Sequence, residues 1–185
     1  GFFQVQNTNQ KIGLFDIAAN ADAPWQCKER IERRLPAYPC GAVGCEVEID
    51  PETGGLSIVS YVAVDDVGIA INPLLVDGQI HGGIAQGVGQ ALMEEIVYDE
   101  MGQLITGSLM DYSMPRADNF PTFKTILNEV ASSSNPLGIK GAGEGGTTPA
   151  PAVIVSAVVD ALKEYGVEHI EMPVTAERIW QAIKE

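Results

Sequence analysis

The sequence predicts an α+β fold with mixed or antiparallel strands and packed helices. Residues 45–67 contain two β-branched, partly alternating runs separated by the turn sequence PETGG, a pattern typical of a β-hairpin. Strand-like and helix-like segments then follow one another without a regular βαβ order. With 185 residues and 45% hydrophobic content, the chain is long enough to bury one core or two small lobes.

The elements outside this hairpin are predicted from hydrophobic periodicity and from turn residues. In chain order they are a candidate helix at 23–34, a linker at 35–41, a helix at 77–96, a second hairpin at 94–108 that turns at Met101-Gly102, a strand at 122–130 and a short strand at 167–172.

Capping residues delimit two further helices near the C-terminus. Thr148 is expected as the N-cap of the first, with Pro149 at its first position, and Gly166 is expected to end it. The polar residues of this segment form only a narrow stripe, so we expect the helix to be mostly buried. Thr175 is expected to cap the last helix, which runs to about Lys184.

Composition and charge disfavour several classes of partner. Eleven Lys and Arg against 25 Asp and Glu give a formal net charge of −14, which repels nucleic acid and anionic membranes. No apolar run approaches the roughly 20 residues needed to span a bilayer, and the start does not resemble a secretory signal. Cys27, Cys40 and Cys45 show no CxxC spacing, which favours a reducing, cytoplasmic setting. Because the first residue is not Met, we expect a piece whose natural upstream sequence is missing.

The segment 77–96 has helical periodicity but contains five glycines, and each of the four in its interior costs up to about 1 kcal/mol. One interpretation is that a bulky ligand lies against this helix and is contacted by Gln79, Gln86 and Gln90, which share one face. The other is close packing against a second backbone, with exposed glutamines. The pattern alone leaves both open. The four glycines are Gly82, Gly83, Gly87 and Gly89.

Glu144 is the most distinctive charged residue, because the run GAGEGG surrounds it with glycines. Glycines allow close approach of a large group and unusual backbone angles, so the carboxylate could reach into a cleft. In a dry cleft such a group becomes a usable general base. The alternative, which composition alone favours, is a surface glutamate in a flexible loop.

The other titratable residues favour plainer interpretations. His81 and His169 are the only histidines, and no neighbouring residues suggest a metal site or a catalytic triad, so we expect packed or surface histidines. The pairs Asp65-Asp66 and Glu94-Glu95 are expected to be solvated or turn-capping carboxylates.

Several ordered blocks of the sequence together resemble the C-terminal part of the molybdopterin-binding large subunit of molybdenum hydroxylases, the xanthine dehydrogenase, aldehyde oxidoreductase and aerobic CO dehydrogenase family. The resemblance implies a two-layer α/β sandwich-like domain over residues 43–185, and it extends more weakly to 1–42 as the N-terminal portion of the preceding subdomain. The blocks are EVEIDPETG, YVAVDDVGIAINPLLVDGQIHGGIAQGVGQAL, YDEMGQLITGSLMDYSMPRADNFP, NPLGIKGAGEGGTTPAPAV and GVEHIEMPVTAERIWQAI.

This resemblance also implies a function and a set of site residues. Glu144 matches the family's active-site glutamate, the general base in the hydroxylation of an aldehyde, an N-heterocycle or CO with water-derived oxygen. The implied cofactor is molybdenum-pterin, in the cytosine dinucleotide form, with no protein ligand to the metal. The implied partners are the remainder of the large subunit, an iron–sulfur subunit and a flavin (FAD) subunit. The residues expected to contact the cofactor are Gln79, Gln86, Gly82, Gly83, Lys140 and Gly141.

Two other functions stay open from the sequence. The piece could be a non-catalytic assembly domain or split subunit that docks against partner chains, or, less favoured, a nucleotide binder using the glycine-rich helix. If the chain is part of a molybdenum hydroxylase, as the resemblance implies, the isolated chain is still expected to be inactive, because the upstream cofactor loops of the family are missing from it.

Overall fold

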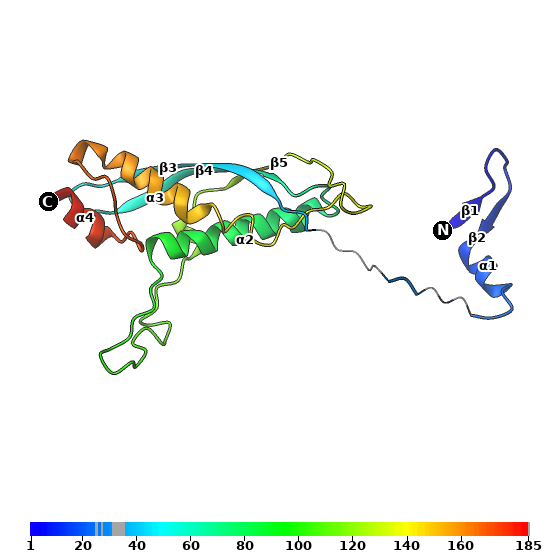
Figure 1. Cartoon of the computed structure of the whole chain (residues 1–185), viewed down its shortest axis with the longest axis horizontal. Helices are drawn as coiled ribbons and strands as arrows, with labels where there is room; N and C mark the ends of the chain where they lie inside the picture. The colour runs from blue at the N-terminus through cyan, green and yellow to red at the C-terminus, as the bar shows by residue number, and fades with distance from the viewer. Residues whose placement is uncertain (25, 27, 31–35, 185) are drawn as a thin grey trace. The chain divides into compact units, whose positions relative to one another are not determined.

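The computed structural model describes residues 1–24, 26, 28–30 and 36–184, which belong to two compact units, Gly1–Arg34 and Leu35–Glu185. The N-terminal unit contains the antiparallel strands β1 (Phe2–Gln4) and β2 (Lys11–Gly13), followed by the short helix α1 (Leu14–Ala19) (Figure 1). The helix predicted at 23–34 is absent from its described residues, and the rest of that prediction lies outside them. The functional division at residues 42 and 43 stays a prediction.

The C-terminal unit is built on a three-stranded sheet in the order β3-β4-β5. The predicted hairpin is confirmed: β3 (Cys40–Ile49) and β4 (Leu56–Asp66) are antiparallel and pair Cys40 with Asp66 at one end. In the turn, the Asp50 carboxylate accepts a hydrogen bond from the backbone N–H of Glu52 at 2.9 Å. The third strand, β5 (Lys124–Leu127), is shorter than predicted and runs parallel to β4.

Two helices, α2 (Pro73–Leu92) and α3 (Ala150–Ala161), pack against each other and against the sheet (Figure 1). This arrangement confirms the predicted two-layer α+β architecture. The core between the layers is formed by alternate residues of β4 and by the inner faces of both helices. Its buried residues are Ile58, Tyr61, Ala63, Ile80, Ile84, Val88, Ala91, Ala150 and Ile154.

A second core cluster joins the end of α3 to the last helix, α4 (Ala176–Lys184). The predicted cap is confirmed, because the Thr175 hydroxyl accepts a hydrogen bond from the backbone N–H of Arg178 at 3.3 Å. Gly166 lies in the left-handed region at φ 79°, after the short 3-10 turn η2 (Lys163–Tyr165) that follows α3. The predicted helix end at Gly166 therefore marks the end of η2.

Three details of the sequence prediction are wrong in this unit. Residues 167–172 form no strand, because Val167 and Ile170 pack into the second core cluster instead of pairing with the sheet. The N-cap of α3 is Pro149 and not Thr148, since the Thr148 hydroxyl donates to the carbonyl oxygen of Glu144. The helix α3 buries only three residues in this chain, Ala150, Ile154 and Val158, so it is less buried than expected.

The second predicted hairpin exists only as a chain reversal. Gly102 has a left-handed φ of 80°, and one isolated antiparallel bridge joins Tyr98 to Leu104. The segment extends away from the sheet and helices, so no third strand supports the pairing (Figure 1). The 3-10 turn η1 (Ala117–Asn119) then leads toward β5. None of the helices within the described ranges combines the length and apolar character needed to cross a membrane.

Candidate functional site

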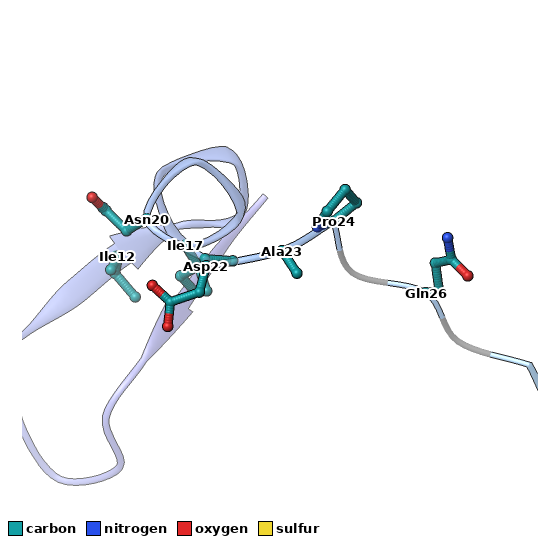
Figure 2. Close-up of a pocket in the computed structure, with 8 residues that line it drawn as sticks. Ile12, Ile17, Asn20, Asp22, Ala23, Pro24 and Gln26 are labelled. Carbon is teal, nitrogen blue, oxygen red and sulfur yellow. The ribbon is translucent and has the colours of Figure 1, made fainter.

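Two hollows of about 670 Å³ each differ sharply in their chemistry. The first lies beside α1 in the N-terminal unit. Figure 2 shows that its polar side chains, Asn20, Asp22 and Gln26, lie apart from one another, with Gln26 on the extended segment that leads away from α1. No residue predicted to belong to the site lines this hollow, so it does not carry the predicted chemistry.

The second hollow lies in the C-terminal unit and is lined by Glu144; we call it the Glu144 pocket. Its walls come from three segments: the residues that lead into β3, the C-terminal end of β4, and the loop before α3. The lining residues are Ala37, Tyr38, Pro39, Cys40, Gly41, Val43, Asp65, Gly141, Gly143, Glu144, Gly145, Thr148 and Pro149.

The loop that carries Glu144 has an ordered backbone. The carbonyl oxygen of Glu144 accepts hydrogen bonds from the backbone N–H groups of Thr147 and Thr148 at 3.1 and 3.0 Å, and from the Thr148 hydroxyl at 2.9 Å. The Thr147 hydroxyl donates in turn to the carbonyl oxygen of Gly83 in α2 at 3.0 Å. These bonds hold the backbone, while the Glu144 side chain is exposed and free to meet a ligand.

The glycines of α2 serve two different purposes. A Cβ on Gly83 would lie 2.9 Å from the backbone nitrogen of Thr147, and a Cβ on Gly87 would lie 2.5 Å from the Cβ of Ala150, so these two glycines admit close packing of the loop and α3. At Gly82, by contrast, nothing lies within 4 Å of a Cβ. The close-packing interpretation is therefore confirmed for Gly83 and Gly87, while the ligand interpretation stays a prediction for the open side of the helix at Gly82.

The three glutamines of α2 are all exposed, as expected for one shared face. Gln79 donates a hydrogen bond from Nε2 to the carbonyl oxygen of Gly143 at 3.0 Å, and the Thr147 hydroxyl donates to Oε1 of Gln86 at 3.5 Å. This face therefore borders the Glu144 loop, with Gly82 leaving open space between Gln79 and Gln86.

Lys140 and Gly141 connect the same loop to the sheet. The Lys140 ammonium group lies 2.5 Å from the buried carboxylate of Asp66, and the backbone N–H of Gly141 donates to the carbonyl oxygen of Ala37 at 3.1 Å. Asp66 also accepts hydrogen bonds from the backbone N–H groups of Gly68 and Val130 at 2.9 and 3.2 Å. The hydrogen bond from Lys140, with these backbone bonds, lowers the pKa of Asp66 to about 2.

Asp65 is the residue of this site that the sequence prediction missed. It was expected to be solvated or turn-capping, but only 5% of it is exposed, and its Oδ2 atom is buried with no hydrogen-bond partner. A signal was present in the sequence: the alternation of β4 places Asp65 on the same inward side as the buried Tyr61 and Ala63. Asp66 does cap a turn, at Gly68, as expected.

Cys40 lines the Glu144 pocket and donates a hydrogen bond from Sγ to Oδ2 of Asp66 at 3.8 Å, whereas Cys45 and the two histidines line no part of it. His81 lies 3.6 Å from Asp77 and packs edge-on against the Phe123 ring, while His169 is exposed. Burial raises the pKa of Cys45 to about 11, which makes its thiol a poor nucleophile. Within the described ranges no group of three or more His, Cys, Asp or Glu side chains is arranged to hold a metal ion.

Comparison with known proteins gives consistent matches. Residues 7–121 match the family model described as molybdopterin cofactor-binding domain. The chain is 41% identical to the 6-hydroxypseudooxynicotine dehydrogenase complex subunit gamma of Paenarthrobacter nicotinovorans, over 97% of this chain and 24% of that protein. The chain thus spans about a quarter of the length of this relative.

Two solved structures share the fold as well as the sequence similarity. Quinoline 2-oxidoreductase from Pseudomonas putida 86 is 46% identical with a TM-score of 0.72, over 75% of this chain and 18% of that one. Reconstituted CO dehydrogenase from Oligotropha carboxidovorans is 36% identical with a TM-score of 0.75, over 79% of this chain and 18% of that one. The matches cover less than a fifth of either solved chain.

Proposed function

Because the chain belongs to the family of molybdopterin cofactor-binding domains, we propose that it is the C-terminal part of the large subunit of a molybdenum hydroxylase and supplies the general base of the reaction. The observation that carries this proposal is Glu144, an exposed carboxylate on an ordered loop at the wall of a 670 Å³ pocket. The proposed reaction adds a water-derived oxygen to an electrophilic carbon of an aldehyde, an N-heterocycle or CO.

The residues around the loop fit a large planar cofactor on one side. Gln79 and Gln86 offer amide donors and acceptors, and Gly82 and Gly143 have no atom within 4 Å of a Cβ position, so a ring system can approach the backbone there. Gly83 is buried against the loop and contributes by letting it approach α2. When bound, a molybdenum-pterin group, in the proposed cytosine dinucleotide form, would supply the two-electron redox chemistry.

Glu144 has the access that a general base requires. A base must come within hydrogen-bond reach of the proton that it removes. The flanking residues Gly143 and Gly145 bear no side chains that could block the carboxylate, and the three hydrogen bonds to the Glu144 carbonyl hold its backbone in place. Lys140, engaged with Asp66, acts in this proposal by positioning the loop.

The proposed partners are the remainder of the large subunit, an iron–sulfur subunit and a flavin subunit in the cytoplasm. One relative is named as the gamma subunit of a dehydrogenase complex, which supports a function within a multi-subunit assembly. The isolated chain is proposed to be inactive, because it spans only 24% of that relative.

The test is the change Glu144→Gln in the complete protein, with Glu48→Gln as the matched control. Loss of a general base is expected to reduce kcat by about 10²–10⁴-fold, while molybdenum content stays near that of the unaltered protein. Glu48 is an exposed residue near the opposite end of β3 from the pocket, so its variant should keep full activity. Near-normal turnover in Glu144→Gln would refute the assignment.

A further inference from the structure

We propose that Asp65 is a second ligand-binding carboxyl group in the Glu144 pocket, and that it makes the pocket favour a small ligand bearing an ammonium or N–H group over a carboxylate ligand. The proposal adds a substrate class to the proposed function. It depends on that function only in the statement that the ligand is the substrate. The binding site itself is inferred from the pocket.

Asp65 is an unsatisfied polar group at the pocket wall. It is 95% buried, and no described donor reaches its Oδ2 atom. Buried polar atoms almost always have hydrogen-bond partners, because a carboxyl group removed from water without one is costly. Its neighbour Asp66 shows the contrast, with four donors in place from Lys140, Gly68, Val130 and Cys40. Since Oδ2 is enclosed by the protein, a ligand in the pocket could reach Asp65 only through Oδ1.

The second carboxyl oxygen of Asp65, Oδ1, is not among the enclosed atoms and lies beside two glycines of the pocket wall. Oδ1 would lie 2.8 Å from a Cβ on Gly41 and 3.8 Å from a Cβ on Gly145. Both glycines line the pocket, on β3 and on the Glu144 loop respectively. Because neither residue has a side chain, no side chain covers Oδ1 from these two positions.

The charges around the pocket determine which ligand fits. Its described lining contains two carboxyl groups, Asp65 and Glu144, and no Lys, Arg or His. The nearby ammonium group of Lys140 is engaged with Asp66. A carboxylate or phosphate ligand would be repelled, whereas an ammonium or N–H group could donate to Oδ1. Burial raises the pKa of Asp65, and a cationic ligand would favour its ionised form again.

The experiment compares three probes of nearly equal size on the 185-residue chain: benzylamine, benzyl alcohol and benzoate. Binding is followed by NMR through the backbone amides of Gly41 and Gly145. At pH 7 we expect benzylamine to shift both signals saturably, benzyl alcohol to bind more weakly and benzoate not to bind. Asp65→Asn should weaken benzylamine binding about tenfold, the size of a hydrogen bond between charged groups. The charge-matched control Glu48→Gln should leave it unchanged.

Two results would overturn the proposal. One is benzoate binding as tightly as benzylamine in the unaltered chain, a measurement that needs no variant to fold. The other is unchanged benzylamine binding in a folded Asp65→Asn chain. Because the readout is binding and not turnover, it is independent of the Glu144→Gln test. An active Glu144→Gln protein would refute the proposed function and leave this site standing.

Discussion

The close contact between the Glu144 loop and α2 makes Gly146→Ala the sharpest test of how the site is built. A Cβ at residue 146 would lie 2.9 Å from the backbone nitrogen of Ile84, and closer still to the carbonyl oxygen of Ile80, whereas ordinary contacts begin at 3.4 Å. Both atoms belong to the backbone of a helix, so the loop must retreat by at least about half an ångström. Overpacking of this kind costs about 1–3 kcal/mol.

The matched control is Gly143→Ala in the same loop. Nothing lies within 4 Å of a Cβ there, and Gly143 does not have a left-handed φ, so its stability should change by less than about 0.5 kcal/mol. Urea unfolding of both variants measures the difference. Thermal unfolding should show Gly146→Ala lower by about 2–10 °C for a chain of this size.

Activity of the complete protein, compared with that of the unaltered protein, gives a second readout for Gly146→Ala. Displacing a base by a fraction of an ångström to 1 Å can reduce its rate by up to about 10²-fold. We expect such a loss in Gly146→Ala, without loss of the Glu144 carboxylate. If Gly146→Ala were as stable as Gly143→Ala and as active as the unaltered protein, the contact with α2 would not be what positions the loop.

Three further predictions concern the stability of the 185-residue chain, measured by thermal unfolding across pH. Lys140→Met should lower Tm at neutral pH, because it removes the cation that pairs with Asp66. The folded pKa of Asp66 is about 2 against an ordinary 3.8, so this stabilisation is complete above pH 3.8 and is lost as pH falls through 2. The difference in Tm between the variant and the unaltered chain should therefore vanish near pH 2. Asp65→Asn should raise Tm at pH 7, because burial raises the pKa of Asp65 and so makes its ionised form destabilise the folded state. This gain in Tm should disappear below about pH 3.8, where the carboxyl group is protonated in both the folded and the unfolded chain. A lower Tm of the variant at pH 7 would contradict the prediction. Thr175→Ala should cost about 1 kcal/mol by removing the cap of α4, and an unchanged Tm would argue against that cap.

Local patterns predicted the elements whose stability depends on nearby residues. The hairpin of β3 and β4 was predicted because its strand alternation and its turn residues lie close together in the sequence. The cap at Thr175 was predicted for the same reason. The strand expected at 167–172 was wrong, because strand formation requires a partner strand, and its apolar residues contact α3 and α4 instead.

Residue types and their order were enough to predict the α+β class, the family resemblance and the isolation of Glu144 among glycines. Which glycines serve packing and which leave open space depends instead on what lies opposite each one in the fold: the loop at Gly83, and nothing at Gly82. The fold also makes two adjacent carboxylates differ. Asp66 is paired with Lys140, 74 residues further along the chain, whereas Oδ2 of Asp65 lacks a partner at the pocket wall. Distant residues meet only in the fold, so no local pattern could assign those partners.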